Sequence, residues 1–173
     1  YKYRTDSNGY MVFDTITTTT WSSGEDLYGG SWSSTGYTLI QKYDETMTEY
    51  RDKDGKVRKA YLFSYYINSY DPDNPETGRI KLFDQKNNDK LIYLTPEVKI
   101  HTTADGTDIF GNKTHTETDS TYLIVQGKLV IQSSASTTTS TDILGNATES
   151  HNDVVYKYRT DSNGYMVFDT ITT

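Results

Sequence analysis

The chain begins and ends with the same eighteen residues, YKYRTDSNGYMVFDTITT, at positions 1–18 and again at 156–173. Related strands within one fold normally diverge, because a pleated surface accepts many residues of similar shape. An identity that extends to Lys, Arg, Asp and Asn is therefore not something that folding requires. We interpret it as one full period, plus an overlap, of a chain that repeats every 155 residues (156 − 1). A period of this kind has to be considered before any local pattern.

The repeat predicts the domain organisation. Residues 1–155 form one full repeat unit, and residues 156–173 are the start of the next identical repeat. The alternative is an engineered duplicate of one hairpin that completes its own sheet. A second and more diverged repeat lies inside the unit, because TDIFGNKT at 107–114 and TDILGNAT at 141–148 agree at six of eight positions. This shorter repeat predicts two related hairpins.

The composition favours an all-β fold. Thr and Tyr, which are frequent here, favour strands, whereas the strong helix formers Ala and Leu are scarce. We expect antiparallel hairpins that form a β-sandwich or an elongated sheet module, repeated in tandem. Asn-Gly at 8–9 and 163–164 predicts hairpin turns with positive φ. Residues 37–51 and 57–70 should be the arms of a long hairpin, with one face of the second arm, that of Tyr61 and Tyr65, in the core.

A stretch rich in Gly and Ser, residues 21–36, is predicted to be a loop. It contains both tryptophans of the chain, Trp21 and Trp32. The simpler interpretation is that the two rings fold the loop back onto the sheet. The more specific hypothesis is a carbohydrate-stacking platform, with Trp21 and Trp32 as ligand-binding residues.

Two short acidic segments are candidate calcium sites. Calcium takes six to eight oxygen ligands, and alternate carboxylates in a turn supply some of them. Asp and Asn also stabilise turns by bonding their own backbone, so ordinary turn chemistry is the competing interpretation. No other cofactor is expected. The candidate ligands are Asp71, Asp73, Glu76, Asp52 and Asp54.

No catalytic motif accompanies the three histidines, His101, His115 and His151, so we do not expect an enzyme. The absence of Cys removes thiol catalysis and disulfides. The net charge of −7 argues against nucleic acid or an anionic membrane as a partner. No apolar run reaches the length of about 18–20 residues that spans a bilayer.

In its repeat, its Thr, Ser and Tyr content, its acidity and its lack of Cys, the chain resembles long tandem-repeat β-rich proteins of bacterial surfaces, such as adhesin stalks and extracellular filaments. The resemblance is one of character and rests on no single motif. It implies an extracellular structural module at the cell surface that stacks end to end, with β-strand complementation between repeats. The partners would be neighbouring copies of the same repeat. The alternative function is a carbohydrate- or surface-binding β module, with surface glycans as partner.

Overall fold

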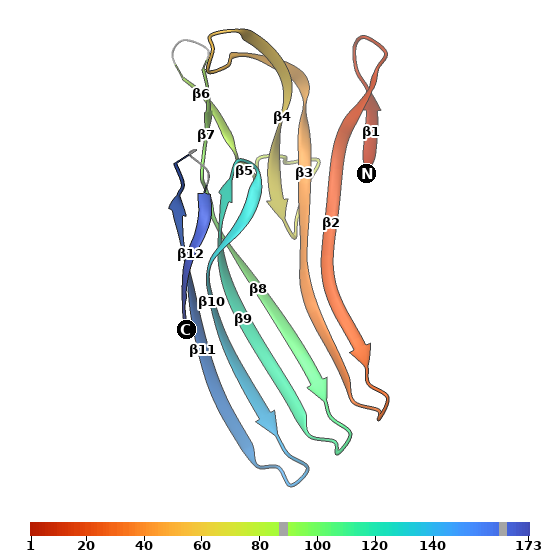
Figure 1. Ribbon diagram of the computed structural model, residues 1–173. Coiled ribbons are helices and arrows are strands. Elements are labelled where there is room, and N and C mark those ends of the chain that lie inside the picture. The colour runs from red at the N-terminus through yellow and green to blue at the C-terminus, as the bar shows by residue number, and fades with distance from the viewer. Residues whose placement is uncertain (87–89, 163–165) are drawn as a thin grey trace. The chain divides into compact units, whose positions relative to one another are not determined.

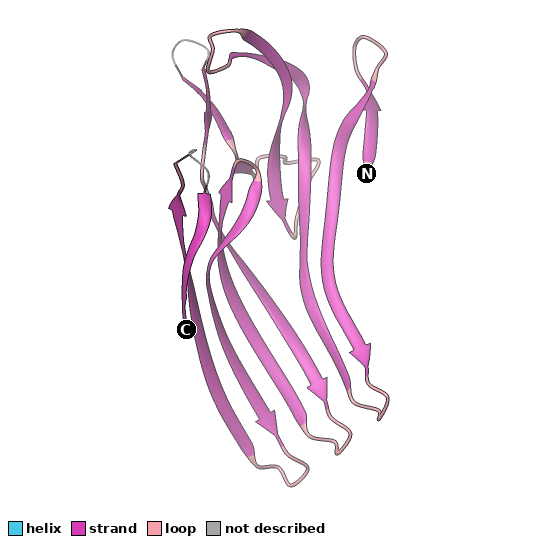
Figure 2. Cartoon of the chain, in the orientation of Figure 1, coloured by secondary structure: helices cyan, strands magenta, loops and turns pink. Residues whose placement is uncertain are grey.

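A computed structural model describes residues 1–86, 90–162 and 166–173. The described residues form strands and turns, with no helix (Figures 1 and 2). The prediction of an all-β fold is confirmed. The strands are β1 (Lys2–Thr5), β2 (Met11–Glu25), β3 (Ser31–Arg51), β4 (Val57–Ile67), β5 (Ile80–Lys81), β6 (Phe83–Lys86), β7 (Lys90–Tyr93), β8 (Glu97–Thr107), β9 (Lys113–Val125), β10 (Lys128–Thr141), β11 (Ala147–Thr160) and β12 (Met166–Thr172).

The strands belong to one open sheet with the order β1-β2-β3-β8-β9-β10-β11-β12. A branch leaves this path at β3, because β4 pairs with β3 and β5, and β7 pairs with β3 and β6. The described pairs are antiparallel except for one parallel bridge between Arg51 and Lys90. Of the two expected architectures, the structure therefore has the open sheet rather than the sandwich.

Five hairpins close with the same five-residue turn, Asp-x-x-Gly-x. In each, the Asp N–H donates to the carbonyl of the fifth residue, and the Gly N–H donates to the Asp carbonyl. One Asp Oδ1 also accepts the N–H groups of the third and fifth residues, at 2.8–3.0 Å. The five aspartates are Asp6, Asp26, Asp52, Asp108 and Asp142.

The turn at Asp6 corrects the predicted Asn-Gly geometry. Only Gly9 has a positive φ, at 84°, and Asn8 does not. Three residues lie between the paired Asp6 and Tyr10, and the last of them, Gly9, is left-handed. Glycine adopts this conformation without a Cβ penalty. The matching Asn163-Gly164 prediction lies outside the described residues.

The prediction of a loop at residues 21–36 is wrong. β2 continues to Glu25 and β3 begins at Ser31, so only the turn at 26–30 is not strand. Gly and Ser are poor strand formers alone, but neighbours compensate for them here. The Trp32 ring lies against Gly24, where an added Cβ would come 2.1 Å from ring carbon Cη2. An aromatic ring that covers a glycine in this way restores side-chain packing to the strand.

The chain divides into two compact units. Unit 1 comprises Tyr1–Thr19, Thr38–Pro96 and Ile124–Lys128, and unit 2 comprises Thr20–Tyr37, Glu97–Leu123 and Leu129–Thr173. β2 and β3 contribute residues to both units.

Unit 1 contains most of the buried apolar side chains. Tyr65, Tyr66, Leu82 and Ile124 are each at most 6% exposed. The predicted hairpin of β3 and β4 is present, with Arg51 opposite Val57. The expectation that only one face of β4 is core is wrong, because Ser64, Tyr65 and Tyr66 are consecutive and all buried. The segment that follows β4 covers its second face, since the Tyr66 hydroxyl bonds the Pro75 carbonyl and Arg79 Nε donates to Ser64 Oγ at 2.8 Å.

A chain of aromatic rings crosses the strands of unit 1. Neighbouring ring centroids lie 5.0–5.9 Å apart, which is within the range of favourable aromatic pairs. The contacts pass from strand to strand, so the rings tie β1, β2 and β3 to the branch of β4, β6 and β7. In order, the rings belong to Tyr3, Phe13, Tyr43, Phe63, Phe83 and Tyr93.

Unit 2 is a more polar part of the sheet, with fewer buried apolar side chains than unit 1. β8 pairs with β9 along its full length, with Glu97 opposite Leu123 at one end and Thr107 opposite Lys113 at the other. Hydroxyl contacts link neighbouring strands, as between Thr116 and Thr138 at 2.9 Å. Paired Thr residues of this kind stabilise strands while facing water. The two related hairpins predicted from the short repeat are confirmed as β8–β9 and β10–β11, which share the same turn and its hydrogen bonds.

Candidate assembly interface

The duplicated sequence folds twice into the same hairpin. In the first copy Tyr3 is opposite Phe13 and Thr5 opposite Met11, with a bulge next to Lys2. In the second copy Tyr158 is opposite Phe168 and Thr160 opposite Met166, with a bulge next to Lys157. Adding 155 to each residue of the first register gives the second. The strand pairing and its register are therefore the same in both copies wherever both are described.

The two copies differ in their neighbours. In the first copy, β2 is an inner strand that lies between β1 and β3 in the strand order. In the second copy, the same residues form β12, which is the last strand of that order. The comparison shows which side chains of the hairpin are built to meet a third strand.

Asp14 in β2 is the centre of the contacts between the first copy and β3. Its carboxylate accepts hydrogen bonds from Lys42 Nζ and from Arg4 Nη1, the latter at 3.3 Å. Arg4 also donates to the carbonyls of Tyr43 and Asp44. Only 13% of the Asp14 side chain is exposed. Burial acts to raise the pKa of Asp14, but the hydrogen bonds from Lys42, Thr15 and Arg4 outweigh it and hold the pKa below its usual value.

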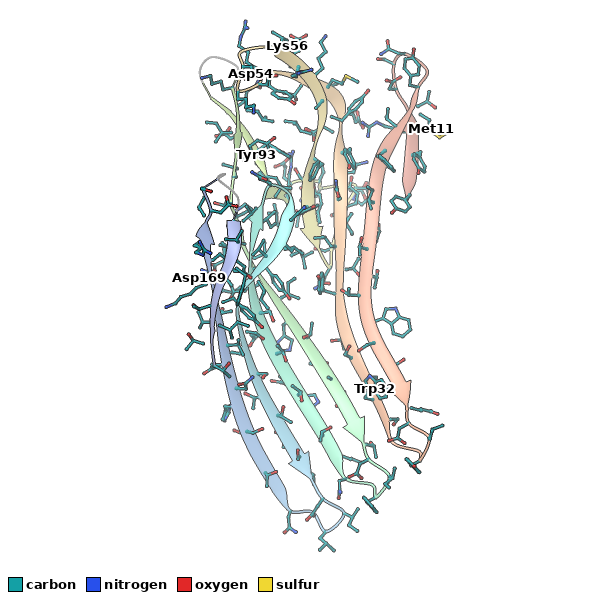
Figure 3. All side chains as sticks on the ribbon, in the orientation of Figure 1. Met11, Trp32, Asp54, Lys56, Tyr93 and Asp169 are labelled. Carbon is teal, nitrogen blue, oxygen red and sulfur yellow. The ribbon has the colours of Figure 1, made fainter. Side chains whose placement is uncertain are left out.

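The corresponding residues of the second copy are much more exposed. Arg159 Nε lies 3.6 Å from Asp169 Oδ1, a loose ion pair. The Arg159 side chain is 65% exposed, against 19% for Arg4, and the Asp169 side chain is 44% exposed. Figure 3 labels Asp169 on β12. The second hairpin therefore presents an acid and a base that the first hairpin buries against β3.

The aromatic side chains repeat this contrast. Phe13 stacks on Tyr43 of β3, with ring centroids 5.9 Å apart. The second copy keeps the ring pair of Tyr158 and Phe168 within its own hairpin, at 6.0 Å. Phe168 is 51% exposed, against 39% for Phe13. The second hairpin therefore offers the ring of Phe168 and the carboxylate of Asp169 on β12 and the guanidinium of Arg159 on β11. In the first copy, the same three groups contact Lys42, Tyr43 and two backbone carbonyls of β3.

The candidate calcium ligands occupy two separate turns. Asp52 Oδ1 accepts the N–H groups of Asp54 and Lys56, and its Oδ2 accepts Arg58 Nε at 3.0 Å. The Asp54 side chain lies at the outer end of that turn, where Figure 3 labels it beside Lys56. The carboxylate oxygens of Asp52 thus already have donors from the chain.

Asp71, Asp73 and Glu76 lie in the connector between β4 and β5. Asp71 Oδ1 accepts the Asp73 N–H at 2.9 Å, and Glu76 pairs with Arg79 at 2.6 Å. Among residues 1–86, 90–162 and 166–173, no group of three or more acidic or His side chains is placed to hold a metal ion. The geometry here is that of ordinary turns.

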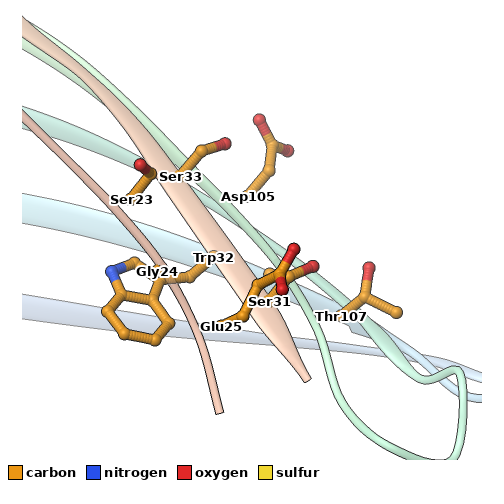
Figure 4. Close-up of a pocket in the computed structure, with 9 residues that line it drawn as sticks. Ser23, Gly24, Glu25, Ser31, Trp32, Ser33, Asp105 and Thr107 are labelled. Carbon is orange, nitrogen blue, oxygen red and sulfur yellow. The ribbon is translucent and has the colours of Figure 1, made fainter. Parts of the chain in front are cut away.

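Trp21 and Trp32 are not brought together. Ser22 Oγ lies 3.0 Å from Ser34 Oγ, and Gly24 lies under the Trp32 ring, so these residues share one face of β2 and β3. Because side chains alternate along a strand, Trp21 belongs to the opposite face. Trp32 borders an open hollow of about 530 Å³ (Figure 4), and Trp21 borders a separate one of about 280 Å³. The polar residues that line the hollow at Trp32 are Ser23, Glu25, Ser31, Ser33, Asp105 and Thr107.

Each histidine lies beside a carboxylate on exposed strands of unit 2. His101 bonds Asp119 at 2.8 Å, and His151 Nε2 lies 2.7 Å from Glu149. His115 bonds Asp105 at 2.7 Å, and the hydrogen bonds to Asp105 and to Glu117 raise its pKa. These are cross-strand or same-strand contacts between an imidazole and a carboxylate on an open surface.

Sequence reasoning did not identify Lys42 or Asp14 as members of an interface. The available signal was the duplication itself, since a strand that occurs twice can be inner once and outer once.

No protein-family model matches the chain, and no match was found among curated proteins or solved structures. Within the described part of the chain, no helix has the length and apolar character needed to cross a membrane.

Proposed function

We propose that the chain is a structural repeat module of an extracellular fibre or adhesin stalk, in which each module completes its neighbour by strand pairing. The observation that carries this proposal is the pair of identical hairpins with identical register, one docked on β3 and one at the end of the strand order. The partner is another copy of the same repeat.

The docking would reuse contacts already present in unit 1. In a chain with a period of 155 residues, the strand after β12 is the next module's copy of β3. That strand would bring equivalents of Lys42 and Tyr43 to Asp169 and Phe168. Both edges of each module would then be paired, which removes the exposed strand edges that otherwise aggregate. Modules of this kind extend in one dimension, with a constant interface at each junction.

Tandem chains of one, two and three 155-residue periods, each followed by residues 156–173, test the proposal. We expect the free energy of unfolding per module to rise with copy number, by about 1–3 kcal/mol per junction from the newly paired Asp and Arg side chains. The largest dimension in small-angle X-ray scattering should grow by a constant increment. The matched control carries Lys42→Ala in every module after the first. Modules that unfold independently at the midpoint of the single chain would refute the strand-pairing junction.

A second experiment tests strand completion directly. Residues 1–155 without the second hairpin lose the Tyr158–Phe168 ring pair and the bond from the Tyr158 hydroxyl to the Ile131 carbonyl, at 2.7 Å. We expect a lower thermal midpoint, which a peptide of residues 156–173 added in trans should restore. The same peptide with Val167→Pro, which cannot complete the ladder, is the control. Equal midpoints for residues 1–155 and 1–173 would exclude completion.

A carbohydrate-binding module remains the second candidate function. The hollow beside Trp32 favours it, because a half-exposed indole stands next to serine and carboxylate side chains (Figure 4). Its volume falls within the range of about 300–1,000 Å³ that is usual for small-molecule sites. A glycan array tests this function, and hits that Trp32→Ala leaves unchanged would count against it.

A further inference from the structure

Three of the five Asp-x-x-Gly-x turns carry large apolar side chains at their two free positions. All three turns belong to unit 2, at residues 26–30, 108–112 and 142–146. Their exposed fractions range from 48% to 98%, whereas side chains of this kind are normally buried. The six residues, which we call the apolar tip, are Leu27, Tyr28, Ile109, Phe110, Ile143 and Leu144.

The turn geometry does not require apolar residues. The two turns of unit 1 have the same hydrogen bonds, yet they carry Ser7-Asn8 and Lys53-Asp54 at the same positions. Asp and Gly alone fix the backbone, and the side chains between them point outward. The hydrogen bonding of these turns therefore does not account for the apolar residues of unit 2.

The three turns lie side by side at one end of unit 2 (Figure 1). Ser31, which follows the first turn, pairs with Thr107, which precedes the second. The second and third turns are in contact, because the Ile143 N–H donates to Asn112 Oδ1 at 3.2 Å. The three neighbouring turns thus bring the six exposed apolar side chains to one end of unit 2. Large contiguous apolar patches of this kind mark interaction sites.

The backbone of the turn at Asp142 suits an apolar environment. Of the five N–H groups in the turn at Asp142, all have acceptors: Asp142 Oδ1 takes two, the Asp142 and Asn146 carbonyls take one each, and Asn112 takes that of Ile143. A donor left unsatisfied in a low-dielectric medium would cost several kcal/mol. The turn at Asp142 can therefore leave water without exposing a free N–H donor.

The charges around the tip restrict its partner. The residues that flank or close the three turns include four carboxylates, Glu25, Asp26, Asp108 and Asp142, and one ammonium, that of Lys113. Hydrogen bonds from the neighbouring Asn side chain and turn backbone lower the pKa values of Asp108 and Asp142, so both stay ionised. An anionic surface would be repelled. A second tip would bring two such sets of four carboxylates together.

We propose that the apolar tip inserts into the surface of a zwitterionic lipid bilayer whose headgroups carry a quaternary ammonium, as phosphocholine does. The aliphatic side chains would enter the acyl boundary, while the aromatic rings of Tyr28 and Phe110 and the four carboxylates would meet the choline layer. This inference rests on the geometry of unit 2 alone and does not depend on the proposed repeat function.

The test is flotation of the full chain with phosphatidylcholine vesicles. The variants copy the polar turn of unit 1 onto the tip: Leu27→Ser with Tyr28→Asn, Ile109→Ser with Phe110→Asn, and Ile143→Ser with Leu144→Asn. Because Asp and Gly are kept, the turns and the thermal midpoint should be preserved. We expect each pair to weaken vesicle binding at least about tenfold, from the apolar surface removed. The control Met11→Asn removes an exposed apolar side chain outside the tip and should leave binding unchanged.

Depth of insertion supplies an independent measurement. The chain has no Cys, so a single one can carry an environment-sensitive fluorophore. Leu144→Cys places it in the tip, and Asn8→Cys places it at the same turn position in unit 1. We expect a blue shift on adding vesicles for the first and none for the second.

Three outcomes would overturn the proposal. The first is equal binding of phosphatidylcholine vesicles by the wild-type chain and by a variant that combines all three pairs of substitutions. The second is stronger binding to vesicles rich in phosphatidylserine, which would contradict the repulsion of anionic lipid by the four carboxylates. The third is self-association in sedimentation equilibrium that the tip substitutions abolish while vesicle binding is absent, which would make a second copy the occupant.

Discussion

Asp14 on β2 and Lys42 on β3 form a salt bridge that the identical Asp169 cannot form within its own hairpin. The bridge joins two strands of unit 1, and Arg4 completes it from β1. The same eighteen residues thus give a buried ion pair in one place and an exposed one in another.

The first prediction concerns the strength of this bridge. Lys42→Ala should lower the free energy of unfolding by about 1–3 kcal/mol, because it leaves a mostly buried carboxylate with one fewer donor. Chemical denaturation monitored by circular dichroism measures the change. Asp169→Asn is the matched control and should cost under about 1 kcal/mol, as exposed ion pairs do. A larger loss from Asp169→Asn than from Lys42→Ala would contradict the assignment of Asp14 as the docked copy.

The second prediction concerns acid stability. The pKa of Asp14 is lower in the folded chain than its value of about 3.9 in an unfolded one, so the unfolded state takes up the proton first as pH falls. The stability that Asp14 contributes is complete above about pH 5 and is lost as pH falls through about 4 towards the folded pKa. Asp14→Asn should therefore reduce the slope of stability against pH below about 5, measured by thermal melts. An unchanged slope would show that Asp14 is not held ionised.

The third prediction concerns the shared turn. Asp142→Ala removes the acceptor for the N–H groups of Leu144 and Asn146 and should lower the thermal midpoint. Asp142→Asn keeps an acceptor oxygen and should lower the midpoint less. Amide exchange at Leu144 and Asn146 checks the local cause, since only the alanine variant should lose protection there.

The fourth prediction concerns Gly24. A Cβ at this position would overlap the Trp32 ring, so Gly24→Ala should displace the indole and destabilise unit 2 by about 1–3 kcal/mol. In a Trp21→Phe background, the emission maximum of Trp32 reports the displacement. Ser33→Ala, in the neighbouring strand position, should leave the spectrum unchanged.

The fifth prediction concerns calcium. The oxygens of Asp52 and the side chain of Glu76 already have Arg partners, so a cation would have to displace them. We expect neither chelator nor millimolar calcium to move the thermal midpoint by more than about 1 °C, given the few free ligands for an ion that takes six to eight. A clear rise with calcium that Asp71→Asn removes would establish a site in the connector.

Much of the fold follows from local sequence. The composition predicts strands, and the short repeat predicts the β8–β9 and β10–β11 hairpins, because turn chemistry and strand preference are properties of adjacent residues. The strand character of residues 21–36 could not be predicted, since it depends on Trp32 covering Gly24 across the ladder. The burial of both faces of β4 depends likewise on a segment that returns over it. The contact between Asp14 and Lys42 could not be predicted either, because the two residues lie 28 positions apart in the sequence.

The shared turn separates the stability of a hairpin from the identity of its tip. Asp and Gly close the loop through the backbone, and the two residues between them range from Ser-Asn to Ile-Leu while the four hydrogen bonds that define the turn stay the same. The second and third positions of each turn can therefore be exchanged while the sheet stays intact. Selection, or an engineer displaying peptides, can vary the turns of such a sheet one at a time without first having to restabilise the scaffold.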